Sequence, residues 1–155
     1  MTGSVLLTGS TGLVGKRLLK QLTSLGHRVV TYDRSSPPPD TESVTHVQGD
    51  LGDLPRMLAA INARDVDRIV HTAAQSHPKL SLSFPTATFH ANVTGTLNLY
   101  EAARITGVTR IVNYSSERAY GNAEGFVRED HALRPTTPYG VTKVTGELLG
   151  DVWRE

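Results

Sequence analysis

The sequence predicts an α/β protein with a parallel sheet at its centre. Short apolar runs rich in branched residues alternate along the 155 residues with longer segments of helical periodicity, and this alternation is typical of repeated β-α units. Crossovers between parallel strands are right-handed, which favours the strand order 3-2-1-4-5 with helices on both faces. Because no linker or repeat interrupts the alternation, we expect one domain over residues 1–155.

The individual elements follow from the local pattern. The expected strands are Ser4 to Thr8, Arg28 to Tyr32, Val44 to Gln48, Arg68 to Thr72 and Arg110 to Tyr114. The expected helices run from Leu13 to about Leu25, from just after Asp53 to about Ala63, from Pro85 to Ile105 and from about Pro138 onward. Gly26 and Gly107 are expected to end two of these helices, as glycine commonly does. The stretch Ser35 to Asp40 contains three prolines, which predicts an exposed loop.

Composition and charge exclude several classes of protein. Lys and Arg number 16 against 15 Asp and Glu, so the formal charge of +1 predicts neither a nucleic-acid partner nor an anionic membrane. The chain has no cysteine, which rules out disulfides and thiolate metal sites within it, and its histidines lack metal-ligand spacing, so we expect no metal. Neither a signal peptide nor a long apolar run is present, and we therefore expect a cytoplasmic protein without a membrane segment.

A glycine-rich turn follows the first expected strand. It reads TGSTGLVG from Thr8 to Gly15 and opens a helix, the context in which glycines let backbone amides approach a pyrophosphate. The helix N-terminus adds roughly half a positive charge. The turn predicts a Rossmann-type dinucleotide site, against the alternative of a glycine-rich turn that binds nothing. The expected cofactor-binding residues of this turn are Gly9, Thr11, Gly12, Leu13, Val14 and Gly15.

Asp33 follows the second expected strand and lies 24 residues after Gly9. A carboxylate at this place accepts hydrogen bonds from the ribose hydroxyls of a dinucleotide. It also repels a 2′-phosphate, so the sequence favours NAD over NADP. Arg34 leaves NADP open, because a guanidinium pairs well with phosphate. The alternative role for Asp33 is that of a solvated loop acid.

Seven short segments of the chain match the motifs of one family. In sequence order they are Gly9-x-x-Gly12-x-x-Gly15, Gly49-Asp50-Leu51, His71-Thr72-Ala73-Ala74, Asn92-Val93-Thr94-Gly95-Thr96, Tyr114-Ser115-Ser116, Tyr120-Gly121 and Tyr139-Gly140-Val141-Thr142-Lys143. In this order and spacing they resemble the extended short-chain dehydrogenase/reductase family, which comprises nucleotide-sugar epimerases, dehydratases and reductases. The resemblance covers essentially the whole chain.

The resemblance implies further contacts with the cofactor. It implies that Asp50 binds the adenine amine, that the backbone after the fourth strand lies along the cofactor, and that Asn92 supports the active site. Asp50 could instead cap a turn, and Asn92 could be a polar helix residue with a backbone partner. The residues that the resemblance adds to the cofactor-binding set are Asp50, Leu51, Thr72, Ala73, Ala74, Asn92, Tyr139 and Lys143.

The same resemblance assigns catalysis to Ser116, Tyr139 and Lys143. Tyr139 and Lys143 are four residues apart on an expected helix, so their side chains share a face. A phenol is a poor base at neutral pH, but a nearby ammonium and a positive nicotinamide ring favour the phenolate. Lys143 is also expected to hydrogen-bond the nicotinamide ribose, and Ser116 to donate to the substrate oxygen. Together they would take a proton from a sugar hydroxyl while hydride passes from its carbon to the cofactor; the alternative is an ordinary surface Tyr and Lys.

The loop after Ser116 bears on the type of reaction. Sugar 4,6-dehydratases that resemble this chain carry an acid two residues beyond the catalytic hydroxyl, and Arg118 occupies that position here. Glu117 is adjacent, but on a strand-like backbone we expect it to point elsewhere. The loop therefore favours a 4-epimerase, which removes hydride and returns it to the opposite face of the sugar, over a dehydratase.

The family resemblance also implies a longer polypeptide with a C-terminal substrate domain. We expect residues 1–155 alone to be an incomplete Rossmann domain that ends before the later strands, binds cofactor weakly and turns over little. Two alternatives remain: a fragment of an NADP-dependent carbonyl reductase, and a non-catalytic NAD-binding module. In intact relatives the helices that begin near Pro85 and Pro138 form a dimer bundle, so a homodimer is a further hypothesis.

Overall fold

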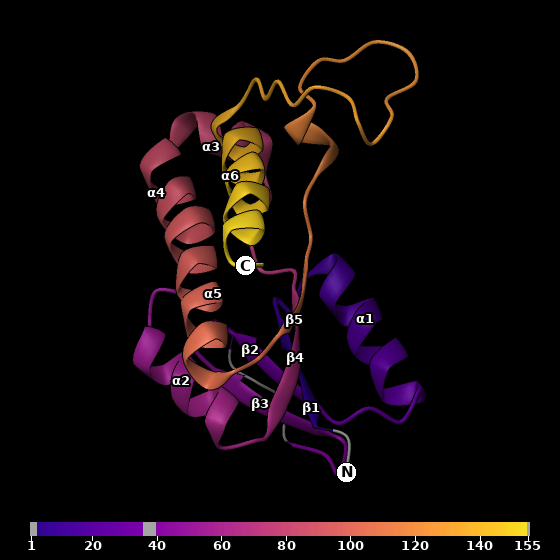
Figure 1. Cartoon of the computed structure of the whole chain (residues 1–155), viewed down its shortest axis with the longest axis vertical. Helices are drawn as coiled ribbons and strands as arrows, with labels where there is room; N and C mark the ends of the chain where they lie inside the picture. Colours follow the sequence, from indigo (N-terminus) through magenta and orange to yellow (C-terminus); the bar gives the residue numbers. More distant parts are fainter. Residues whose placement is uncertain (1–2, 36–39, 155) are drawn as a thin grey trace. The chain divides into compact units, whose positions relative to one another are not determined.

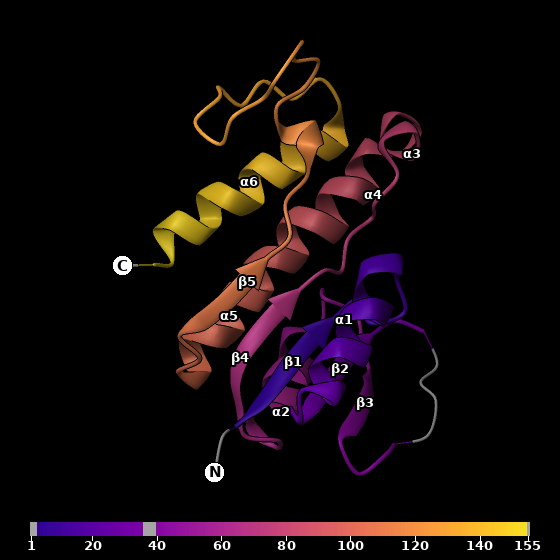
Figure 2. The same ribbon diagram turned by 90° about the vertical axis from the view of Figure 1, so that its right-hand side faces the viewer.

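The computed structural model describes residues 3–35 and 40–154. Its five strands form one parallel sheet in the order β3-β2-β1-β4-β5, which confirms the predicted order (Figure 2). The strands are β1 (Ser4–Thr8), β2 (Val29–Asp33), β3 (Val44–Gln48), β4 (Val66–His71) and β5 (Arg110–Asn113). The bounds of β2, β4 and β5 differ from the expected ones by one or two residues, and residues 36–39 of the expected proline loop lie outside the described residues.

The helices match the expected ones with two additions. They are α1 (Leu13–Ser24), α2 (Leu54–Asn62), α3 (Pro78–Ser83), α4 (Pro85–Phe89), the π-helical turn η1 (His90–Thr94), α5 (Gly95–Thr106), the 3-10 turn η2 (Glu117–Ala119) and α6 (Pro138–Val152). The helix expected from Pro85 to Ile105 is thus divided by a π-helical turn, and α3 and η2 have no counterpart in the prediction. Short elements of this kind lack the periodicity from which longer helices are predicted.

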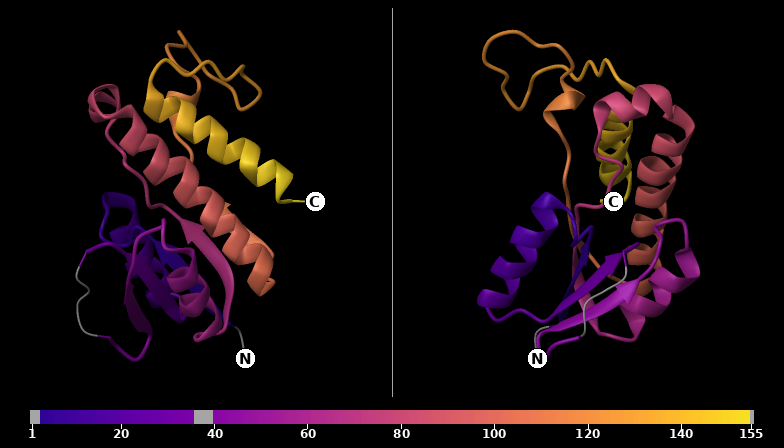
Figure 3. Two further views of the ribbon diagram at one scale, coloured as in Figure 1. Left: turned by 90° about the vertical axis from the view of Figure 1, so that its left-hand side faces the viewer. Right: turned by 180° about the vertical axis from the view of Figure 1, so that it is seen from behind.

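The chain divides into two compact units, Met1–Ala73 with Asn98–Tyr114 and Ala74–Leu97 with Ser115–Glu155. The first unit contains the sheet, with α1 on one face and α2 and α5 on the other (Figure 1). The second contains α3, α4, η1, η2 and α6, and there α6 contacts each of the other four elements (Figure 3). None of the helices in the described ranges has the length and apolar character needed to cross a membrane.

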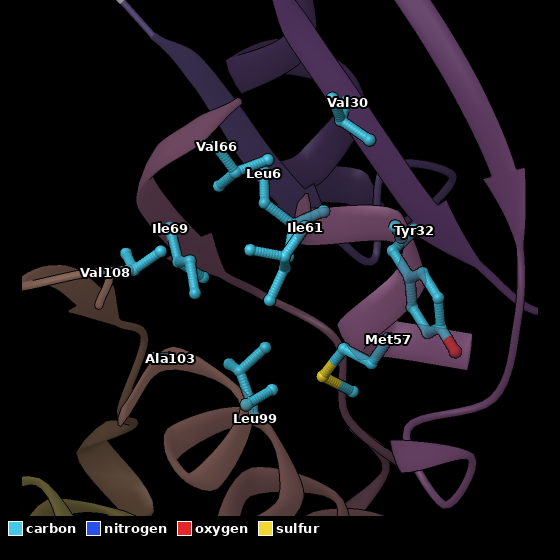
Figure 4. Packing of buried hydrophobic residues seen from close by; sticks show 12 residues of the cluster. Leu6, Val30, Tyr32, Met57, Ile61, Val66, Ile69, Leu99, Ala103 and Val108 are labelled. Atoms are coloured by element: carbon cyan, nitrogen blue, oxygen red, sulfur yellow. The ribbon is translucent and has the colours of Figure 1, made fainter. Parts of the chain in front are cut away.

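The core of the first unit lies between the sheet and the helices α2 and α5 (Figure 4). Leu6 of β1 and Ile69 of β4 face Ile61 of α2 and Leu99 of α5, and all four side chains are at most 2% exposed. Full burial of one such side chain contributes about 2 kcal/mol. This packing holds the carboxyl ends of the strands in fixed positions, and those ends carry most of the predicted cofactor residues.

Several helix ends confirm the signals read from the sequence. The side chain of Asp53 accepts a hydrogen bond from the Arg56 amide at 3.0 Å and caps α2. Gly26 and Gly107 follow α1 and α5 with φ values of 81° and 76°, the left-handed conformation in which glycine ends helices. At the sheet edge, Val112 of β5 is 57% exposed.

Candidate functional site

The turn between β1 and α1 is built so closely that its first and last glycines have no room for a side chain. Gly9 has a φ of 72°, and a Cβ there would lie 2.6 Å from the amide nitrogen of Ala73. A Cβ on Gly15 would lie 2.1 Å from the carbonyl oxygen of Gly9. The amide of Gly12 donates to that same oxygen at 3.0 Å. The three glycines therefore close a tight turn, in which residues 11–14 are exposed.

The start of α1 has free capacity for a negative charge. Gly12 is its N-cap, no side chain of the described residues caps it, and its first turn carries no acid. The first turns of helices leave backbone amides without internal partners, and these amides attract anions. Leu13 and Val14 are 78% and 42% exposed, so no core packing covers this end.

Asp33, at the end of β2, turns its carboxylate toward the glycine turn. Its Oδ2 accepts from the amide and the hydroxyl of Thr11 at 3.0 and 2.9 Å, and its Oδ1 accepts from the Ser35 amide at 3.1 Å. Partial burial, the largest single effect, acts to raise the pKa of Asp33, but the hydrogen bonds from Thr11 and Ser35 outweigh it and the pKa lies below its ordinary value. Asp33 is therefore an anion beside the turn at neutral pH.

Asp50 lies in the loop that Tyr32 holds in place. The Tyr32 hydroxyl donates to the Asp50 carbonyl at 3.0 Å, and its ring fills the space where a Cβ of Gly49 would be, 2.3 Å away. The Asp50 carboxylate accepts from the Gly52 amide at 2.7 Å and lies 4.0 Å from Arg34 Nε. Both roles weighed for Asp50 thus remain available, because it closes a turn while its side chain is 58% exposed.

Leu51 differs from its neighbour. Its side chain packs against the core and its carbonyl accepts from Asn98 Nδ2 at 2.9 Å. This hydrogen bond attaches to α5 the loop in which Asp50 lies.

The segment after β4 is fixed to the end of β1. Thr72 donates from its hydroxyl to the Thr8 carbonyl at 2.7 Å, and the Ala73 amide donates to Thr8 Oγ1 at 3.3 Å. The Thr8 hydroxyl also shares a buried hydrogen bond of 2.7 Å with His71 Nδ1. The backbone of Thr72 and Ala73 is therefore held beside the glycine turn. Ala74, the next predicted residue, is half-buried and begins the second unit.

Asn92 in η1 is 4% exposed and its amide group is fully engaged. Its Oδ1 accepts from the Gln75 amide at 2.7 Å, and its Nδ2 donates to the Gln75 carbonyl at 3.1 Å and to Thr142 Oγ1 at 3.0 Å. Asn92 thus has backbone partners at Gln75 and also joins that segment to the helix of Tyr139. These contacts are compatible with both roles weighed for it.

Tyr139 and Lys143 lie one turn apart on α6. Tyr139 is 7% exposed, and Lys143 Nζ lies 5.9 Å from the centre of its ring, within the range of a cation–π attraction. Burial lowers the pKa of Lys143 below its ordinary value. The two side chains thus share one face of the helix, as their spacing predicts.

Ser116 lies where the chain leaves β5, and its surroundings correct one expectation. Its hydroxyl donates to Glu117 Oε2 at 2.9 Å and accepts from the Arg118 amide at 3.2 Å. Our expectation that Glu117 points elsewhere is therefore wrong. The physical reason is that the chain enters the 3-10 turn η2 directly after Ser116, so the alternation of a strand no longer applies. Arg118 pairs with Glu117 at 3.1 Å.

The Ser116 segment packs against α6. A Cβ on Gly140 would lie 2.5 Å from the Arg118 carbonyl oxygen, so η2 approaches the helix as closely as a glycine allows. The neighbouring Ser115 hydroxyl donates to Glu147 of α6. The second unit therefore brings the three predicted catalytic residues onto two elements in direct contact.

Several residues that shape these sites escaped the sequence reasoning. No sequence motif assigns a role to four residues whose hydrogen bonds only the fold reveals, namely Thr8, Tyr32, Ser81 and Thr142. A signal did exist for Tyr32, because a glycine such as Gly49 after a strand often marks a close approach. No group of three or more His, Asp or Glu side chains in the described part of the chain could hold a metal ion.

Comparison with known proteins gives a family match over nearly the whole chain. Residues 5–155 match the model of the NAD dependent epimerase/dehydratase family. The UDP-glucose 4-epimerase of Mycolicibacterium smegmatis is 33% identical over 161 residues, which cover 96% of this chain and 50% of that protein. The dTDP-glucose 4,6-dehydratase of Streptomyces antibioticus is 31% identical over 160 residues, covering 94% and 47%. The chain thus spans about half the length of the curated relatives it matches.

Solved structures of similar fold agree. MoeE5 in complex with UDP-glucuronic acid and NAD is 36% identical, with a TM-score of 0.89, and the match covers 97% of this chain and 49% of that one. The UDP-glucose 4-epimerase of Brucella ovis in complex with NAD is 29% identical with a TM-score of 0.89, and the coverages are 97% and 49%.

Proposed function

This chain belongs to the NAD-dependent epimerase/dehydratase family, and from that premise we propose that it is the dinucleotide-binding part of a sugar-nucleotide epimerase that oxidises and re-reduces a sugar carbon. The observation that carries the proposal is the turn after β1, where Gly9 and Gly15 leave no room for a Cβ and the first amides of α1 remain open. Because the relatives are about twice as long, we expect low turnover from residues 1–155 alone.

The first unit fits a nicotinamide dinucleotide. The backbone amides that follow Gly12 at the start of α1 would hold the pyrophosphate, and Asp33 and Asp50 would hold the adenosine half. The depressed pKa of Asp33 keeps it negative, which supports NAD over NADP because a 2′-phosphate would be repelled. When bound, the nicotinamide ring supplies the hydride acceptor.

The second unit fits the proton transfer. Tyr139 would hold the proton taken from the sugar hydroxyl, and the ammonium of Lys143 on the same helix face would favour its phenolate form. Ser116 would donate to the same substrate oxygen, and the hydrogen bond that its hydroxyl donates to Glu117 supports this role as a donor. No part of this set requires a metal.

One observation favours a second candidate function. The Glu117 carboxylate lies 2.9 Å from the Ser116 hydroxyl, so an acid is present beside the proposed substrate position. A carboxyl group there could transfer a proton in the elimination of water, which would make the protein a sugar dehydratase. The epimerase remains our first proposal because Arg118 stands where the resembling dehydratases carry their acid and pairs with Glu117 at 3.1 Å.

Calorimetric titration tests the cofactor proposal directly. We expect NAD to release heat of binding and NADP to bind at least tenfold more weakly, since a 2′-phosphate meets the charge of Asp33. Asp33→Asn is expected to narrow this preference, whereas Asp151→Asn, which changes an exposed carboxylate of α6, is expected to leave it unchanged. If folded protein gives a heat of binding with neither NAD nor NADP, the proposal is refuted.

Product analysis separates the two candidate reactions. The longest natural form of the protein is incubated with UDP-glucose or dTDP-glucose and NAD. An epimerase yields the 4-epimer with no net change in absorbance at the end, whereas a dehydratase yields a 4-keto-6-deoxy sugar. Glu117→Gln is expected to keep the kcat of epimerisation within about threefold of the wild-type value. Complete loss of turnover in this variant would favour the dehydratase.

We also propose a homodimer. Phe89 of α4, Leu97 of α5 and, on α6, Val141 and Leu148 are between 37% and 59% exposed. Exposed apolar side chains that form a patch mark an interaction surface. Light scattering at high protein concentration is expected to report twice the monomer mass, and Leu148→Glu is expected to restore the monomer. A wild type that stays monomeric throughout the concentration range would refute this proposal.

A further inference from the structure

The backbone of Tyr139 is held by a buried serine from a distant element. Its amide donates to Ser81 Oγ at 3.1 Å, across 58 positions of sequence. Ser81 lies in α3 and is fully buried, and its own hydroxyl proton goes to the Pro78 carbonyl at 2.6 Å. Ser81 thus accepts from Tyr139 in a fixed orientation.

The first turn of α6 explains why this bond is needed. Pro138 has no amide proton, and Thr137 caps the helix by accepting from the Gly140 amide at 3.1 Å. The Val141 amide donates to the Thr137 carbonyl at 3.0 Å. The Tyr139 amide is therefore the member of this turn that takes its partner from outside the helix, and a buried amide left without a partner is costly.

The carbonyl of Tyr139 is held as well. Thr142 Oγ1 donates to it at 2.7 Å, and Asn92 Nδ2 donates to Thr142 Oγ1 at 3.0 Å. Both backbone groups of Tyr139 are thus fixed by buried side chains, with Ser81 of α3 on one side and the Asn92–Thr142 pair on the other.

We infer that Ser81 is a positioning residue for Tyr139, setting the place of the phenol through the backbone without touching substrate or cofactor. The inference rests on the proposed function of Tyr139 as the proton-transfer group. Reacting groups must be placed closely, and a displacement of about 1 Å costs on the order of a hundredfold in rate. The loss of Ser81 is therefore expected to reduce the chemical step and to leave binding intact.

Ser81→Ala tests the contact without any catalysis. Amide hydrogen exchange, measured by NMR, is expected to rise at least tenfold at Tyr139 relative to Val141, whose acceptor lies within its own helix. Thr88→Val is the matched control, because Thr88 is also fully buried and its hydroxyl donates to the carbonyl of Phe84, the residue directly before α4. Equal exchange at Tyr139 in wild type and Ser81→Ala would overturn the contact.

Turnover tests the positioning role in the longest natural form of the protein. We expect Ser81→Ala to lower kcat about tenfold to a hundredfold with KM and the Kd for NAD within twofold, while Thr88→Val keeps wild-type kcat. If Ser81→Ala does not fold, Ser81→Cys, whose sulfur is a weak acceptor, is expected to give an intermediate kcat. Wild-type kcat in either Ser81 variant would overturn the inference. A wild type that binds no dinucleotide would instead overturn the proposed function, and the positioning role with it.

Discussion

Gly15→Ala is the substitution that the glycine turn tolerates least. The added Cβ would lie 2.1 Å from the carbonyl oxygen of Gly9, 2.8 Å from its carbonyl carbon and 2.9 Å from Ser10 Cα. All three are backbone atoms, so no side chain can rotate away. To reach an ordinary van der Waals separation of about 3.5 Å from that oxygen, the turn and the helix must part by about 1.4 Å.

The cost of this separation follows from packing energetics. One extra methyl group in a well-packed place costs about 1–3 kcal/mol, and a clash with rigid backbone lies at the upper end. We therefore expect Gly15→Ala to lower the free energy of unfolding by about 3 kcal/mol, a large part of the stability of a small domain. The moved amides are expected to weaken NAD binding about a hundredfold, which corresponds to about 2.7 kcal/mol.

Two other glycines separate stability from binding. Gly12 has φ −72° and its Cβ would have Gly9 O as nearest atom at 3.3 Å, so Gly12→Ala is expected to cost less than about 1 kcal/mol in folding but to obstruct the pyrophosphate. No described atom lies within 4 Å of a Cβ on Gly26, whose φ is +81°. Gly26→Ala is therefore expected to cost about 1–2 kcal/mol through backbone strain with NAD affinity unchanged.

Urea unfolding and calorimetric titration with NAD measure the two quantities for all three variants. The expected pattern is a loss of both stability and affinity at Gly15, of affinity at Gly12 and of stability at Gly26. A Gly15→Ala protein as stable as wild type would refute the steric reasoning. Unchanged affinity in Gly12→Ala would show that the dinucleotide does not lie on this turn.

Three further predictions follow from the contacts of single polar side chains. The pKa of Asp33 is lower in the folded protein than in the unfolded one, so the stability that its carboxylate contributes is present above the unfolded pKa of about 3.9 and is lost as pH falls through the folded pKa. The urea midpoints of wild type and Asp33→Asn are therefore expected to converge below pH 4. A difference between the two midpoints that stays constant with pH would contradict this. Burial raises the pKa of Tyr32 to about 12, so the stability that the neutral hydroxyl contributes is present below the unfolded pKa of about 10 and is lost as pH rises through the folded pKa. Over that range the free energy of unfolding of wild type is expected to lose its excess over that of Tyr32→Phe. An excess that persists at pH 12 would contradict the burial of the hydroxyl. Asn92→Ala removes three hydrogen bonds and is expected to cost about 3 kcal/mol, against about 1 kcal/mol for Asn98→Ala, which loses its bond to Leu51; equal denaturant midpoints of the two variants would count against this.

The parts of the fold that are encoded locally could be read from the sequence. Strand order followed from the alternation of elements and the handedness of crossovers, and the glycine turn followed from residues adjacent in sequence. Helix ends at Gly26 and Gly107 were predictable because the left-handed conformation selects glycine. The four-residue spacing placed Tyr139 and Lys143 on one helix face.

Other features depend on contacts that no local pattern encodes. The direction of Glu117 was mispredicted because the chain turns immediately after Ser116, and nothing in the sequence marks where extended backbone stops. The bond from Tyr139 to Ser81 joins residues 58 positions apart, and serine is common enough that its partner cannot be inferred. The π-helical turn at His90–Thr94 likewise could not be predicted, because the spacing of polar and apolar residues there is that of an ordinary helix.

The contact of Tyr32 with Gly49 has a consequence for how such sequences diverge. The aromatic ring occupies the volume that a side chain at position 49 would fill, so the side chains at the two positions compete for the same space. A methyl group gained at 49 would require the ring at 32 to shift or to be replaced by a smaller side chain, so changes at the two positions are coupled. Substitutions at these positions are expected to be inherited as pairs, although the residues lie on separate strand ends.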